Sequence, residues 1–193
     1  MTGDVRNCQT MVMLTYGTAA GHTFYDRRLY LPAGWAGDVE RRRDAGAPEE
    51  ITFATKPGLG IGMLRGAISR GLPFAWVAAD ADYRKDPALR AFLHERALPY
   101  VLGVPVTLPV AGPPGKPYQP AVAQAGDLLH YAIMRDQWER RSQGKGSKQR
   151  YYDWAWFDVV LPGQEPADGF AHHLLIRRST RKKQLAGGRV DFE

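Results

Sequence analysis

The sequence contains almost no cysteine and no long apolar run. Cys8 is the one cysteine among 193 residues, which excludes an internal disulfide framework and any zinc site built on several thiolates. No apolar run approaches the roughly eighteen residues that cross a bilayer. The opening "MTGDVRNCQT" also lacks the basic-then-apolar pattern of a signal peptide. These absences predict a cytoplasmic protein that has no membrane partner.

Negative charge is scarce in the last third of the chain. The segment 139–150 carries five basic residues and one acidic residue, and the segment 177–183 carries five basic residues and none that is acidic. The whole chain has a net charge of +6, so the remainder is slightly acidic. Basic clusters of this kind attract phosphate backbones by counterion release. The alternative is a solvated face, although both clusters alternate with apolar segments that are typical of folded structure.

The apolar pattern predicts an α/β fold. We expect a hairpin of two strands over 8–16 and 22–31, and a short helix over 38–45. The region 51–104 indicates strand, helix, strand, helix, strand, which is typical of a largely parallel sheet with helical crossovers. The hairpin is expected to add antiparallel strands at the N-terminal side of this sheet. The helices of the region are expected over 56–71 and from Asp86-Pro87, where Leu89, Phe92, Leu93 and Ala97 would form the buried face of the second.

A second, β-rich region is expected after a loop that holds six prolines in sixteen residues, 105–120. The segments 151–162 and 171–179 are predicted to form an antiparallel pair of strands. The expected organisation is therefore a domain over 1–104 and a basic, β-rich region over 105–193.

Asp80 ends the apolar run "FAWVAAD", which is predicted to be a strand buried on both faces over 74–80. Open α/β sheets place ligands at the carboxyl ends of their strands, and hard cations such as Mg²⁺ and Mn²⁺ take carboxylate oxygens. Asp80 is therefore a candidate metal ligand. An aspartate after a strand also commonly begins a turn or caps a helix, and Asp86 is better explained as such a cap.

Aromatic and basic residues alternate between 138 and 156. Aromatic rings beside cations can stack unpaired bases while the cations neutralise phosphates. Alternate aromatics can equally form the core of a hairpin, which is the interpretation we favour for Trp154 and Trp156 because they share one face of the predicted strand. The basic residues proposed to bind nucleic acid are Arg140, Arg141, Lys145, Lys148, Arg150, Arg177 and Arg178.

The sequence contains seven motifs that, in their order along the chain, resemble those of the bacterial insertion-sequence transposases of the DDE type. The RNase H-like domain of these transposases is interrupted by a β-rich insertion. Together the motifs extend over almost the whole chain. The motifs are "NCQ" (7–9), "RRLYLPAGW" (27–35), "FATKP" (53–57), "WVAADADY" (76–83), "YVLGVP" (100–105), "SQGKGSKQRYYDWAW" (142–156) and "LLIRRS" (174–179).

The resemblance implies metal-dependent DNA strand cleavage and strand transfer by two aspartates and a glutamate that hold two divalent ions, Mg²⁺ or Mn²⁺. Asp80 matches the second aspartate. The resemblance also implies that the partner is DNA at the transposon ends and that the protein is located in the cytoplasm or the nucleoid. The full-length proteins of the family act as dimers.

The same comparison leaves the first aspartate and the glutamate without a counterpart among these 193 residues. Asp4 is too close to the "NCQ" motif, and Glu193 is not assigned. We therefore expect a partial RNase H-like sheet with flanking helices and a basic β-rich insertion, truncated at both ends and inactive alone. The alternatives are a non-catalytic nucleic-acid-binding module and a non-functional remnant of a mobile element.

Overall fold

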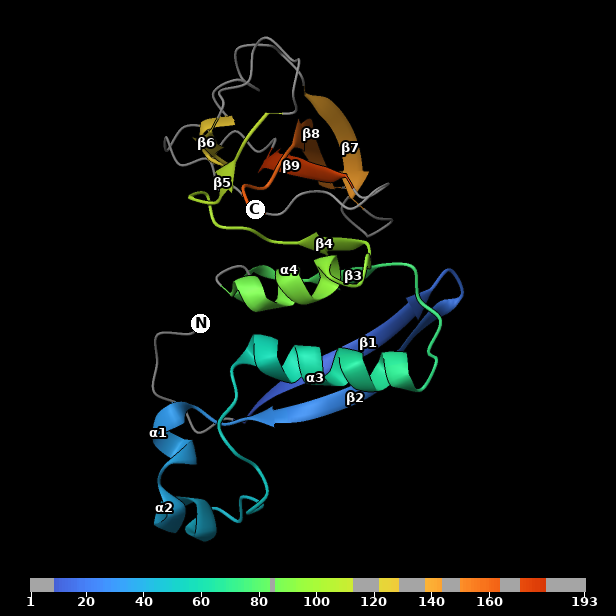
Figure 1. Cartoon of the computed structure of the whole chain (residues 1–193). Helices are drawn as coiled ribbons and strands as arrows, with labels where there is room; N and C mark the ends of the chain where they lie inside the picture. Colours follow the sequence, from blue (N-terminus) through green and yellow to red (C-terminus); the bar gives the residue numbers. More distant parts are fainter. Residues whose placement is uncertain are drawn as a thin grey trace. The chain divides into compact units, whose positions relative to one another are not determined.

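The computed structural model describes residues 9–83, 86–112, 122–128, 138–143, 150–163 and 171–179. The chain divides into two compact units, Met1–Leu102 and Gly103–Glu193. Both helices and strands are present, so the chain is a mixed α/β protein, as the sequence predicts. Figure 1 labels these elements.

The first unit begins with the predicted hairpin. Strands β1 (Thr10–Thr18) and β2 (Gly21–Tyr30) pair antiparallel. Two short helices follow, α1 (Ala33–Ala36) and α2 (Val39–Asp44). Helix α2 was expected from the sequence, whereas α1 was not, because its four residues are too few to give a helical pattern.

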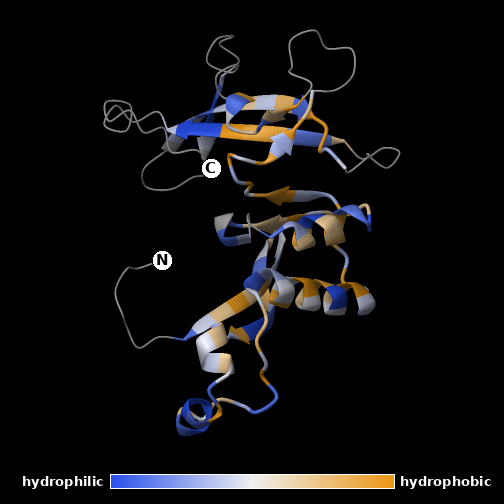
Figure 2. Ribbon diagram, turned by 60° about the vertical axis from the view of Figure 1, so that its left-hand side comes forward, coloured by the Kyte–Doolittle hydropathy of each residue, from blue (hydrophilic) through white to orange (hydrophobic). Residues whose placement is uncertain are grey.

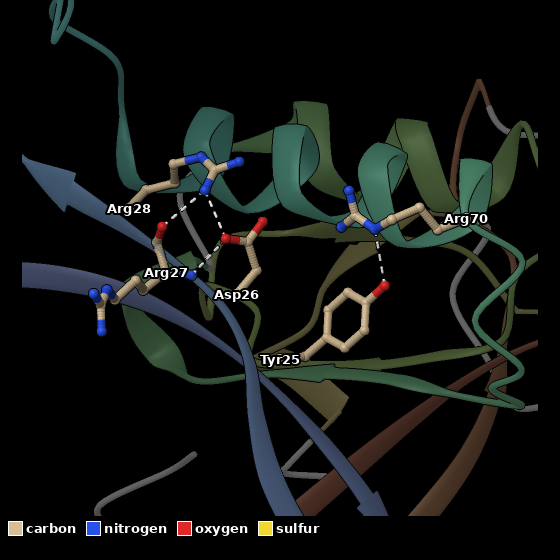
Figure 3. Close-up of polar contacts among 5 residues, drawn as sticks. All are labelled: Tyr25, Asp26, Arg27, Arg28 and Arg70. Atoms are coloured by element: carbon tan, nitrogen blue, oxygen red, sulfur yellow. Dashed lines mark hydrogen bonds and ion pairs between the residues drawn. The ribbon is translucent and has the colours of Figure 1, made fainter.

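A bulge in the hairpin turns one side chain toward the next helix. The pairing register shifts after Leu14, which leaves Tyr25 as the extra residue of β2. The Tyr25 hydroxyl accepts a hydrogen bond of 3.0 Å from Nε of Arg70, at the end of helix α3 (Lys56–Ser69). Figure 3 shows this contact beside the neighbouring pair in which Arg28 donates to the Asp26 carboxylate over 2.6 Å. The bulge thereby links the hairpin to α3.

The remaining part of this unit is a strand–helix–strand arrangement. Strand β3 (Val77–Ala79) and strand β4 (Tyr100–Leu102) pair parallel. Between them lie the short 3-10 helix η1 (Ala81–Tyr83) and helix α4 (Pro87–His94). The parallel pairing and the start of α4 confirm the sequence predictions.

Both longer helices begin with a side-chain cap, of which the sequence predicts the one at Asp86. Thr55 accepts a hydrogen bond from the backbone N–H of Gly58, and Pro57 lies in the first turn of α3. Asp86 accepts one from Ala88 at the start of α4. These side chains satisfy backbone donors that a helix leaves without an internal partner.

The two helices also end alike, with one residue in the left-handed region. Gly71 has φ of 68° after α3, and Ala97 has φ of 48° after α4. In each case the backbone N–H of the following residue bonds to a carbonyl five positions earlier, from Leu72 to Ala67 and from Leu98 to Leu93. This is the Schellman end, in which glycine is the usual left-handed residue.

The core of the first unit lies between α3, α4, β3 and β4. It consists of Leu64, Val77, Leu89, Phe92 and Leu93, with Leu14 of the hairpin packed against it. The sequence assigned Ala97 to this core, which is wrong: Ala97 is exposed because α4 has ended before it.

Three other expectations for this unit are corrected. The strand predicted over 74–80 has only three residues, Val77–Ala79. It is not buried on both faces, because Ala78 is exposed, as is its partner Val101 on β4. Residues 51–55 form no strand. The hairpin was expected to extend the parallel sheet, but among the described residues β1–β2 and β3–β4 are separate two-stranded sheets.

The second unit contains a three-stranded antiparallel sheet in the order β7–β8–β9. Its strands are β7 (Glu139–Gln143), β8 (Arg150–Val159) and β9 (His172–Ser179). The pairing of β8 with β9 confirms the prediction, whereas β7 was not expected. A small antiparallel pair, β5 (Pro109–Val110) and β6 (Ala123–Gln124), lies in the loop region.

Alternate residues of β8 and β9 build the core of this unit. Ala155, Phe157 and Val159 are buried on β8, and Leu174 and Ile176 on β9. Figure 2 shows the apolar middle of β9 between its polar ends. Because side chains alternate along a strand, the residues between these core positions lie on the other face of the sheet.

Candidate functional site

Asp80 directly follows β3, where the sequence places it, and its side chain is exposed. Its Oδ1 accepts a hydrogen bond of 3.0 Å from the backbone N–H of Asp82, and its carbonyl accepts one of 3.2 Å from Tyr83. Asp80 therefore begins the η1 turn, as the alternative interpretation of this aspartate expected. A turn former can still present its carboxylate to a ligand.

The η1 turn is held from two sides. Tyr83 packs against the core of the first unit, and burial, followed by the nearby Asp80 carboxylate, raises the pKa of its hydroxyl. Lys56, at the start of α3, forms an ion pair with Asp82 in which Nζ and Oδ2 are 2.6 Å apart. These contacts fix the backbone that follows Asp80.

The Lys56–Asp82 pair gives a measurable pH dependence. The hydrogen bond to Asp82 raises the pKa of Lys56 above its ordinary value of 10.5. The pair therefore contributes its full stability below that value and loses it as the pH rises through the raised pKa. Because the Asp82 side chain is 57% exposed, the contribution is expected to stay below about 1 kcal/mol.

We expect an NMR titration of the Lys56 side chain to have its midpoint above 10.5. In Asp82→Asn the midpoint should return toward that ordinary value. A midpoint that is equal in the two proteins would contradict the pairing.

The carboxylates near Asp80 do not complete a metal site. Within the described ranges, no three or more histidine, cysteine, aspartate or glutamate side chains gather closely enough to hold a metal ion. Asp82 is the nearest other carboxylate in sequence, and Lys56 binds it. One hard oxygen ligand does not match the donor set that a pair of divalent ions needs.

The arginines proposed to bind nucleic acid that have described side chains lie on two different faces of the β7–β8–β9 sheet. On the face opposite the core, Arg141 of β7 lies beside Tyr152 of β8, and Arg177 of β9 lies beside Trp154. The guanidinium carbon of Arg177 is 4.6 Å from the ring centre of Tyr152. Arg141 forms an ion pair of 2.7 Å with Glu139.

Trp154 and Trp156 do share one face, but it is not the core face. Trp156 is 57% exposed, and its indole N–H lies 3.1 Å from Nδ1 of His173. The prediction that these tryptophans form the hairpin core is therefore wrong. The core positions are the intervening ones, where Ala155 and Phe157 are buried.

Arg140 and Arg178 lie on the core face, at its charged end. Both contact Asp153 of β8, which is only 6% exposed. Nε of Arg140 is 2.8 Å from Oδ1 of Asp153, and Nε of Arg178 is 3.2 Å from Oδ2. The hydrogen bond from Arg140 is the main cause that lowers the pKa of Asp153.

Three basic candidates have no described side-chain position. Lys145 and Lys148 lie outside the described residues, and Arg150 is placed as the first residue of β8 without its side chain.

Sequence reasoning missed Asp153, although a signal was present. Asp153 continues the two-residue alternation of Ala155, Phe157 and Val159, so it falls on the buried face. A buried carboxylate requires charged or hydrogen-bonding partners. Its partners, however, depend on the strand register, which the sequence alone does not give.

Comparison with known proteins decides the family. The sequence model of the DDE superfamily endonucleases matches residues 1–158. This chain belongs to the DDE superfamily endonucleases. The match extends through the first unit and into the β7–β8 region of the second, so it includes Asp80, Arg140, Arg141 and Asp153. No curated protein and no solved structure matches the chain.

The DDE superfamily endonucleases are a nuclease and transposase type of family that acts on DNA and generally uses divalent metal ions. No helix among the described residues is long and apolar enough to cross a membrane.

Proposed function

We propose that this DDE superfamily endonuclease chain is a fragment of an insertion-sequence transposase that acts in DNA strand cleavage and strand transfer. The observation that carries the proposal is the position of Asp80, in the motif "WVAADADY", directly after a parallel strand of a chain that the family model matches. On this proposal the unit Met1–Leu102 is a partial RNase H-like core, and the full-length proteins act as dimers on DNA in the cytoplasm or nucleoid.

Asp80 is proposed as one metal-ligating carboxylate, the second aspartate of the triad. When bound, Mg²⁺ or Mn²⁺ would activate a nucleophile and stabilise the leaving oxygen. The residues described do not supply the remaining ligands, so no reaction step is assigned to this chain by itself. We propose instead that the 193 residues alone bind divalent ions weakly and do not cleave DNA.

Calorimetric titration with Mn²⁺ tests this part of the proposal. The isolated chain is expected to give no saturable binding at micromolar concentrations, because one carboxylate cannot hold a pair of ions. Asp80→Asn serves as the matched control and should give the same trace. Tight binding by the unaltered chain that Asp80→Asn abolishes would contradict the proposal of an incomplete site.

The basic sheet of the second unit is proposed to hold the phosphate backbone of DNA. Its arginines come from all three strands, and guanidinium groups match phosphate geometry. The residues proposed for this role are Arg140, Arg141, Lys145, Lys148, Arg150, Arg177 and Arg178.

A second candidate function is a non-catalytic nucleic-acid-binding module. The exposed face with Tyr152, Trp156 and Arg177 favours it, because aromatic rings beside a cation are suited to stacking unpaired bases. The variant Asp80→Ala in a chain supplied with the remaining triad residues separates the two functions. A nuclease loses metal-dependent nicking, whereas a binding module keeps its DNA affinity unchanged.

A further inference from the structure

One row across the β7–β8–β9 sheet carries only charged residues on the core face. Arg140 pairs in register with Asp153, and Asp153 pairs in register with Arg178. The row follows directly after the apolar positions Ala155 and Ile176. The carboxylate in the middle is therefore flanked by one guanidinium on each neighbouring strand.

Asp153 holds each guanidinium in a fixed orientation. Arg140 donates from Nε and from a terminal nitrogen, over 2.8 and 3.3 Å, so the contact is bidentate. Arg178 donates from Nε over 3.2 Å, and its guanidinium carbon lies 4.0 Å from the ring centre of Trp138. Trp138 packs against the core of the unit, so the apolar core supports the position of Arg178.

The two arginines retain the capacity to bind an anion. A guanidinium has five N–H donors, and Arg140 directs two of its own to Asp153. The Arg140 side chain is 64% exposed and the Arg178 side chain 30%, although the carboxylate between them is almost fully buried. Two positive charges and one negative charge leave the row with a net charge of +1.

We propose that Asp153 is a positioning residue for DNA: it presents Arg140 and Arg178, from strands two spacings or about 10 Å apart, to the phosphodiester backbone of one nucleic-acid strand. This inference rests on the proposed DNA binding by the second unit. It assigns a role in binding an anion to a residue that is itself an anion.

The proposed positioning role and the change in net charge predict opposite effects of Asp153→Asn on DNA binding. Asp153→Asn removes a negative charge, so simple electrostatics predicts tighter DNA binding. Loss of the fixed guanidinium orientation instead predicts weaker binding, by about tenfold, with the slope of log K against log salt reduced in magnitude by about one to two. The slope is the readout that a purely structural role would leave unchanged.

Asp158→Asn is the matched control. Asp158 lies on the same strand with an exposed side chain on the opposite face, and the substitution changes the charge equally. We expect fluorescence anisotropy with a labelled duplex to show unchanged or slightly tighter binding for Asp158→Asn. Binding by Asp153→Asn that is as tight as that of the unaltered chain would overturn the inference.

A second pair of variants decides the question if circular dichroism shows that Asp153→Asn does not fold. Arg140→Lys keeps the charge but loses the bidentate contact. Arg28→Lys makes the same change at an arginine that also pairs with an aspartate, Asp26, but lies on β2 of the first unit, outside the proposed DNA-binding residues. Weaker binding by Arg140→Lys alone supports the inference, and equal binding by the two overturns it. If the unaltered chain binds no DNA, the proposed DNA binding itself fails, which is a separate outcome.

Discussion

DNA binding by this chain is expected to weaken about 100-fold when the salt concentration rises from about 50 to about 200 mM. Each neutralised phosphate contributes about 0.9 to the slope of log K against log salt. The four arginines with described positions, Arg140, Arg141, Arg177 and Arg178, correspond to about four phosphates. Measurement of anisotropy with a labelled duplex at several salt concentrations gives the slope directly.

The control is a matched set of exposed arginines in the first unit. Glutamine at all four sheet positions should reduce the magnitude of the slope by about 3 to 4. Glutamine at Arg27, Arg41, Arg43 and Arg65, which are exposed, changes the net charge equally and should leave the slope nearly intact. If the two sets reduced the slope to the same extent, the DNA-binding surface would not be the β7–β8–β9 sheet.

The Leu93→Ala substitution is expected to lower the free energy of unfolding of the first unit by about 3 kcal/mol, within a range of roughly 2–5. Leu93 is completely buried on α4, in the core that it shares with Val77 and Phe92. The smaller side chain loses its transfer free energy and leaves a cavity that the neighbouring helices and strands only partly fill. Urea denaturation followed by far-ultraviolet circular dichroism measures the change.

Val101→Ala provides the comparison within the same strand–helix–strand arrangement. Val101 lies on β4 and is 60% exposed, so its truncation should change the free energy of unfolding by no more than about 0.5 kcal/mol. Similar losses in the two variants would mean that the core does not lie between α3, α4 and the parallel strands. The test bears on function because the same arrangement carries Asp80.

The sequence predicts those parts of the fold that have local signals. Asp86-Pro87 marks the start of α4 through its cap, and the alternation in β8 identifies a strand. Strand β7, "ERRSQ", has no apolar alternation, and it is recognised only by its pairing with β8. The apolar run before Asp80 predicts a strand but not its length, because apolar character does not reveal that Trp76 is exposed.

The residues of the candidate site likewise fall into those that the sequence predicts and those whose role depends on the fold. Asp80 is found from a motif, since its position depends on the strand directly before it. The roles of the arginines depend on register: adjacent residues such as Arg177 and Arg178 point to opposite faces and have different neighbours. A single row of pairing decides which arginine meets Asp153, and that row joins segments far apart in the sequence.

The two helix ends described above have an evolutionary consequence. Gly71 and Ala97 occupy the same place in the same backbone motif, yet alanine there carries a side chain that costs about 1–2 kcal/mol in the left-handed conformation. Selection retains sequences that are stable enough, and does not drive each position to its optimum. Ala97→Gly at the end of α4, a change of one codon that drift or protein engineering could make, should therefore stabilise the first unit. It alters neither proposed binding surface.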